Sequence, residues 1–211
     1  MDTQTITDRP ADIKIKHYYQ KTPDILLDHE IKPLLDEAIN HSLRDYTIIL
    51  LALNTGLRRN EILGLNVGDI MPFKNIVQVL ELPARIAKGQ KPRSIPLNKK
   101  IRDHLAQYLH QETQSKKIDG SDSPLFRTHY SNKRYRSRNF NFMIQRHAIR
   151  AINRNCYPHM LRHTFATKLI RQANIKIVQE ILGHSNMQNT QIYLHPSTSE
   201  KIEAVNKLDI G

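Results

Sequence analysis

Residues 75–97 interrupt a chain whose apolar residues otherwise recur at helical spacing. On either side of this stretch they fall three and four positions apart, which is typical of amphipathic helices. Within it, three short segments rich in Val, Ile and Leu (76–80, 84–87 and 93–97) read as strands. This order predicts a mainly α (α+β) fold with a small three-stranded antiparallel sheet at one edge.

The helices are expected where that spacing holds and where Gly, Pro or a capping residue marks an end. The run at residues 48–53 is apolar all round, so the helix that carries it should lie in the core. Residues 1–23 are polar, and we interpret them as a tail or linker. The expected helices cover residues 23–41, 43–55, 98–111, 137–153, 158 onward, 175–182, 188–194 and 197–208.

The charge of the chain predicts an anionic partner. It has 32 Lys+Arg against 20 Asp+Glu, a formal net charge of +12. Residues 123–179 contain twelve Lys or Arg and no Asp or Glu. A one-sign run of this length is hard to explain as a balanced solvated face. A protein that is merely basic is the alternative, but nucleic acid is the commonest partner of such a surface.

Other features of the composition exclude whole classes of protein. A single cysteine, Cys156, rules out an internal disulfide and a cysteine-based zinc site. No apolar run approaches the ~18–20 residues that span a bilayer. The first residues, MDTQTITDRPADIK, lack the apolar core of a signal peptide. We therefore expect a soluble cytoplasmic protein without a membrane partner.

The stretch from residue 157 to 193 contains most of the candidate catalytic residues. His159, Arg162 and His163 share one helix face, and His184 and Tyr193 follow; the stretch has no carboxylate before residue 180. Such a site is poor for a metal ion but suits an anion, because a guanidinium matches phosphate oxygens and a tyrosine can act as a nucleophile. The hypothesis is a phosphodiester-cutting site that uses a tyrosine and no metal.

Three local patterns leave alternatives open. The i,i+4 pair of histidines also occurs in zinc proteases, but Met160 stands where those have a Glu. Arg58 and Glu61 form either a surface ion pair or an arginine aimed at a phosphate. Lys88 and Lys91 at a hairpin tip are either solvated or reach into a DNA groove.

Four segments of the chain together resemble one family. They read TGLRRNEILGL, AKGQKPRSIPL, PHMLRHTFAT and LGHSNMQNTQIYLH, in this order. Over about residues 24–208 the chain resembles the catalytic domain of the tyrosine recombinases, or phage integrase family, in its Xer-like branch. The resemblance implies a site-specific recombinase that needs no metal, cofactor or ATP.

The resemblance implies a role for each matching residue. Arg58 and Arg162 would hold the scissile phosphate. Tyr193 would attack the phosphorus, leaving a 3′-phosphotyrosyl bond and a free 5′-hydroxyl. Lys88 would protonate the departing 5′-oxygen.

The remaining residues of these segments would serve the same phosphate. His159 would take or help to transfer the tyrosine proton, and His184 would hydrogen-bond a phosphate oxygen. His163 would support the site, and Glu61 would orient the first arginine. Basic residues near the site are expected on DNA: Lys91, Arg93, Arg134, Arg136 and Arg138.

The resemblance also sets expectations for partners and domains. Double-stranded DNA is the expected partner, with a tetramer on DNA and a monomer as an alternative for the free protein. Residues 24–211 would be the catalytic domain, with the family's N-terminal core-binding domain absent. The helix at 197–208 would pack on a neighbouring subunit or on its own domain. A type IB topoisomerase and a catalytically silent DNA-binding protein derived from an integrase are the rival interpretations.

Overall fold

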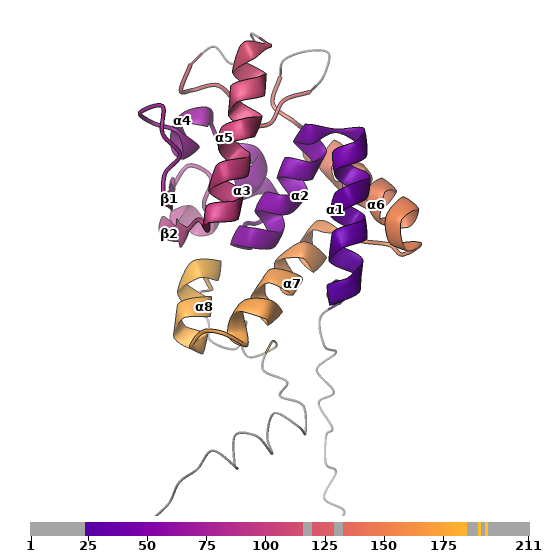
Figure 1. Ribbon diagram of the computed structural model, residues 1–211. Coiled ribbons are helices and arrows are strands. Elements are labelled where there is room, and N and C mark those ends of the chain that lie inside the picture. The colour runs from indigo at the N-terminus through magenta and orange to yellow at the C-terminus, as the bar shows by residue number, and fades with distance from the viewer. Residues whose placement is uncertain (1–23, 116–119, 129–132, 185–189, 191–192, 194–211) are drawn as a thin grey trace, which may run out of the picture.

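The computed structural model describes residues 24–115, 120–128, 133–184, 190 and 193. Over these residues the chain is mainly helical, with one antiparallel sheet of two strands (Figure 1). Among the described helices, none is long and apolar enough to cross a membrane. The helices are α1 (Asp28–His41), α2 (Leu43–Thr55), α3 (Arg59–Gly64), α4 (Val67–Ile70), α5 (Lys99–Gln114), α6 (Ser137–Ile152), α7 (Pro158–Ile170) and α8 (Ile175–Leu182).

Helix α2 lies at the centre of the packing, as its apolar run predicts. It contacts α1, α5 and α7, and residues 47–52 of it are all buried. The Ser42 side chain caps its first turn by accepting a hydrogen bond from the Asp45 amide. Gly56 ends it in the left-handed conformation at φ 62°, where a Cβ would lie 2.4 Å from Phe165 of α7. The predicted bounds of this helix and its place in the core are confirmed.

The sheet pairs β1 (Val79–Leu82) with β2 (Arg93–Pro96), with Leu80 opposite Ile95. The prediction of a third strand at residues 84–87 is wrong. There the Pro83 carbonyl accepts hydrogen bonds from the amides of Ile86 and Ala87, which closes a turn in place of a strand. A short 3₁₀ helix (Lys88–Gln90) follows the turn and leads toward β2.

Helices α7 and α8 lie together at one end of the domain, where α8 also contacts β2 (Figure 1). Pro158 occupies the first position of α7, and Asn174 caps α8 by accepting from the Lys176 amide. Gly183 ends α8 at φ 63°. The tail at 1–23 and the helix predicted at 197–208 lie outside the described residues, and of the helix predicted at 188–194 only residues 190 and 193 are described.

Candidate active site

Arg162 fixes the meeting point of three helices. Its side chain is almost fully buried in α7, at 4% exposure. One terminal nitrogen donates to the carbonyl of Gly56 at 2.5 Å, and the other donates to the carbonyl of Leu182 at 2.7 Å. Both carbonyls lie at helix ends that a glycine terminates, α2 at Gly56 and α8 at Gly183, where a carbonyl lacks a partner within the helix. The guanidinium is therefore held in one orientation by backbone groups.

Arg162 also fixes the tautomer of His184. Its Nη2 lies 3.0 Å from His184 Nε2, and because a guanidinium only donates, that ring nitrogen must accept. The proton is then on Nδ1, which donates to Thr190 Oγ1 at 2.9 Å. Burial, together with the positive charges of Arg162 and Arg58, lowers the pKa of His184 to about 4, so the ring is neutral near pH 7.

Thr190 is a site residue that the sequence analysis missed. It is fully buried and three positions before Tyr193, whose amide donates to the Thr190 carbonyl. A lone threonine in a predicted helix gives no sequence signal for such a role. Both ring nitrogens of His184 have partners here, so the expected bond from His184 to a phosphate would require one of these bonds to open.

The Tyr193 hydroxyl lies 2.7 Å from His163 Nδ1. The tyrosine is 6% exposed. Burial raises its pKa, and the charges of Arg162 and Arg58 offset only part of this rise. Burial and the charges of His159 and Arg162 lower the pKa of His163, which favours its neutral form. The histidine bonded to the hydroxyl is thus the one for which the resemblance implies only a supporting role.

Glu61 holds two arginines from different parts of the chain. It is 1% exposed, and its Oε1 accepts from Arg58 Nη1 at 3.0 Å and from Arg93 Nη1 at 2.9 Å. Its Oε2 accepts from Arg93 Nη2 at 2.8 Å and from the Arg58 amide at 2.8 Å. Burial raises the pKa of Glu61, but the bonds and charges of Arg93 and Arg58 outweigh it and hold this pKa below its usual value. The carboxylate therefore forms a buried double ion pair, not the surface pair that was one alternative.

Arg58, Lys88 and His159 line one cleft of about 530 Å³. Lys88 and His159 are exposed in it, whereas the Arg58 side chain is 21% exposed. Arg58 also reaches the buried cluster, since its Nη2 donates to the Gly183 carbonyl at 3.4 Å. The six predicted catalytic residues thus fall into an open group and a buried group that share this arginine.

A model described as the phage integrase family matches residues 24–200. The chain belongs to the phage integrase family. It is 34% identical over 190 residues to a tyrosine recombinase of Pseudothermotoga lettingae, covering 90% of this chain. The chain spans 62% of that relative's length.

Solved structures share the fold of this phage integrase family member. A XerA recombinase superimposes with a TM-score of 0.72 at 26% identity, over 91% of this chain and 66% of the other. The catalytic domain of bacteriophage HP1 integrase superimposes with a TM-score of 0.59 at 26% identity, over 87% of this chain and 94% of the other. The predicted family and fold class are confirmed.

The five basic residues expected on DNA are of two kinds in this family member: three are exposed, and two are hydrogen-bonded within the protein. Lys91, Arg136 and Arg138 are exposed. The described hydrogen bonds of Arg93 all lie within the protein: they go to Glu61 and, at 2.8 Å, to the Ile181 carbonyl. Arg134 donates to the carbonyls of residues 63 and 65 at 2.7 and 3.0 Å. The structure therefore favours positioning roles for Arg93 and Arg134 over contact with DNA.

Proposed function

We propose that this chain is the catalytic domain of a site-specific tyrosine recombinase that cleaves and rejoins double-stranded DNA. The observation that carries the proposal is the bond between Tyr193 and neutral His163, beside the fixed guanidinium of Arg162. In this proposal a nucleophile, a proton acceptor and an anion-binding group would act together. The similarity to tyrosine recombinases supports the same function, although the chain spans 62% of the relative's length.

In the proposed cleavage step, the Tyr193 hydroxyl gives its proton to His163 Nδ1 as its oxygen attacks the phosphorus. The bond from phosphorus to the 5′-oxygen breaks, and Lys88 protonates that oxygen. Arg58 and Arg162 bind the non-bridging oxygens, where negative charge develops. The products are a 3′-phosphotyrosyl ester and a free 5′-hydroxyl. His159 in the cleft is placed to assist proton transfer.

The phosphotyrosyl ester retains the energy of the broken phosphodiester. Another 5′-hydroxyl can therefore attack it and release Tyr193 without ATP. The guanidinium groups supply the positive charge that a metal ion provides in other phosphoryl transfers. Residues 24–211 would form the catalytic domain, with residues 1–23 as a tail or linker.

The proposed partners follow from the exposed cations. Lys91, Arg136 and Arg138 would contact DNA phosphates, which makes binding strongly dependent on salt. Assembly into a tetramer on DNA and a cytoplasmic location belong to the same proposal. The loss of affinity between low and high salt, measured on duplex DNA, tests the phosphate contacts directly.

A nicked suicide duplex tests the function. The nick lets a short 5′-hydroxyl fragment diffuse away, so the covalent protein–DNA adduct accumulates and is seen on a denaturing gel. Because the target site is unknown, duplexes with a randomised core are used, in EDTA. We expect an adduct with the wild-type chain and with Tyr46→Phe, a control tyrosine on α2, but none with Tyr193→Phe.

The rival function, a catalytically silent DNA-binding protein, predicts a different result. It gives retarded duplex on a native gel but no covalent adduct with any core sequence. It would also give the same binding for wild type and Tyr193→Phe. That outcome would overturn the proposed reaction while leaving the family membership intact.

A further inference from the structure

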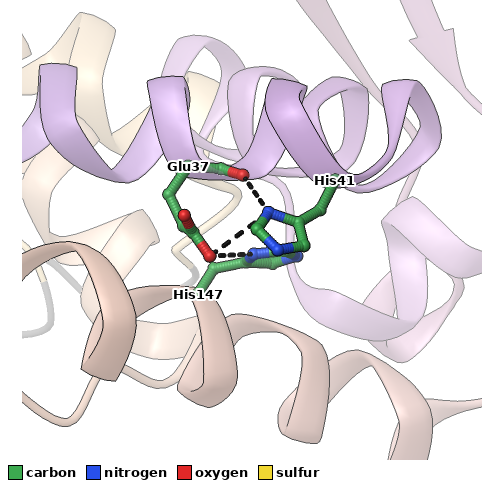
Figure 2. A group of neighbouring side chains, drawn as sticks. All are labelled: Glu37, His41 and His147. Carbon is green, nitrogen blue, oxygen red and sulfur yellow. Dashed lines mark hydrogen bonds and ion pairs between the residues drawn. The ribbon is translucent and has the colours of Figure 1, made fainter.

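A second cluster of functional groups lies between α1 and α6, which contribute none of the proposed catalytic residues. Glu37 and His41 are one turn apart on α1, and His147 faces them from α6 (Figure 2). One ligand atom from each lies within 4.8 Å of the others. Among the described residues, this is the one group of three or more His, Cys, Asp or Glu side chains with that spacing.

The separations match those of a tetrahedral metal site. His41 Nδ1 lies 3.3 Å from Glu37 Oε1, and His147 Nδ1 lies 3.8 Å from the same oxygen. Zinc bonds of about 2.0–2.2 Å at tetrahedral angles place neighbouring ligand atoms about 3.4 Å apart. The ligand atoms of the two histidines lie within 4.8 Å of each other, so binding would draw them closer together. A fourth position would remain for water.

Two buried atoms of the cluster have no hydrogen-bond partner: Glu37 Oε1 and His147 Nδ1. His147 is fully buried, and its Nε2 lies 3.2 Å from Asp45 Oδ2. An ionised carboxylate only accepts, so Nε2 carries a proton, and in the neutral ring Nδ1 presents a lone pair. That lone pair faces a carboxylate oxygen at 3.8 Å, which is too far for a hydrogen bond. A cation between the two acceptors would satisfy both.

The bond that His147 donates to Asp45 is of a kind that metal sites usually contain. Histidine ligands usually donate their second ring nitrogen to a carboxylate, which fixes the tautomer and raises the basicity of the metal-binding nitrogen. Here this outer bond joins α2 to α6, while the inner ligands join α1 to α6. Asp45 already pairs with Arg44 at 2.8 Å, so the charge that would offset the cation is that of Glu37.

We propose that Glu37, His41 and His147 bind a zinc ion that ties α1 to α6. Binding requires one rearrangement at His41. At present its Nδ1 donates to the Glu37 carbonyl at 2.9 Å, and its Nε2 accepts from Arg150 at 3.1 Å. The proton would move from Nδ1 to Nε2, and the Arg150 guanidinium, half exposed, would swing into solvent. Arg150 therefore competes with the metal.

Titration of the tag-free 211-residue chain with zinc chloride, by calorimetry and by thermal unfolding, tests the proposal. One ion should bind per chain and raise the unfolding temperature. Glu37→Gln and His41→Ala should weaken the affinity by more than about a hundredfold, beyond the 10–100-fold cost of losing an outer partner. His147 is left intact because its side chain is fully buried and its loss would leave a cavity between the helices.

Two further variants make the test specific. His110→Ala removes an exposed histidine on α5 and should leave zinc binding unchanged. Arg150→Gln removes the competitor and should tighten binding about tenfold, which loss of an ordinary structural contact would not do. The proposal is overturned if Glu37→Gln and His41→Ala bind zinc as wild type does, or if His159→Ala or His184→Ala abolishes the binding instead.

Discussion

The two halves of the proposed active site differ in how their side chains are held. In the buried half, Arg162, His184 and Tyr193 each have a hydrogen-bond partner within the protein. In the open half, Lys88 and His159 are exposed in the cleft. Arg58 belongs to both halves, because Glu61 and the Gly183 carbonyl hold a guanidinium that also lines the cleft.

The difference fits the needs of the proposed reaction. Groups that stabilise charge on the phosphate gain most from a fixed orientation in a buried environment, where little reorganisation is needed. A lysine that protonates a departing strand must stay charged, and burial would lower its pKa. We therefore expect changes in the buried half to alter both stability and rate, and changes in the open half to alter rate alone.

Among variants that keep the nucleophile Tyr193, Lys88→Ala should have the largest effect on rate. Losing a general acid costs about 10²–10⁴-fold, because the 5′-oxygen must then leave unprotonated. The unfolding temperature should stay within about 1 °C of wild type, since the side chain is exposed. Single-turnover cleavage of a nicked duplex measures the rate.

A substrate with sulfur in place of the bridging 5′-oxygen separates this role from DNA binding. A thiolate leaves without protonation, so this substrate should restore cleavage by Lys88→Ala. Lys91→Ala, on the same segment, should show no such rescue. Equal rescue of both variants would contradict the division between the two halves.

Arg162→Lys should reduce cleavage about 10²–10³-fold, as loss of a transition-state donor does. Lysine keeps the charge but cannot reach the Gly56 and Leu182 carbonyls and His184 together. Stability should fall with the rate, because these buried carbonyls lose their donors. Arg171→Lys, at the exposed end of α7, is the matched control and should match wild type in both measurements.

Glu61→Gln should lower the free energy of unfolding by about 3–5 kcal/mol, because two arginines lose a buried counter-charge. The pKa of Glu61 is lowered in the folded state. Its stabilisation is therefore complete above the unfolded pKa of about 4.3 and is lost as the pH falls through the folded pKa. Urea unfolding from pH 7 to 3 should show this acid-sensitive component in wild type and in Glu81→Gln, but not in Glu61→Gln.

Thr190→Val should have the smallest effect, about a tenfold loss of rate. This loss corresponds to the free energy of about one net hydrogen bond. Without the hydroxyl, His184 Nδ1–H loses its acceptor, and the ring orientation is no longer fixed. Thr190→Ser keeps the acceptor and should restore most of the rate. If valine and serine behave alike, the hydroxyl does not position His184.

Local patterns predicted the helices well because their causes are local. The apolar run and Gly56 defined α2, and Pro158 and Asn174 marked the starts of α7 and α8. The third strand failed because Val/Ile content does not reveal that the Pro83 carbonyl will close a turn.

Contacts between distant residues were not predictable in the same way. Arg93 was expected on DNA. Nothing in the sequence around it shows that it will pair with Glu61, 32 positions earlier. The position of His147 against Glu37 and His41 follows only from the packing of α1 on α6. The i,i+4 spacing of Glu37 and His41 was the one available signal.

The identity of the residue that becomes attached to DNA tests the account most directly. The adduct from a nicked duplex, formed in EDTA, is digested with nuclease and protease, and the nucleotide-bearing peptide is sequenced by mass spectrometry. The account predicts a 3′-phosphonucleotide on Tyr193 and no adduct from Tyr193→Phe. A nucleotide on another residue, or an adduct that persists in Tyr193→Phe, would contradict it.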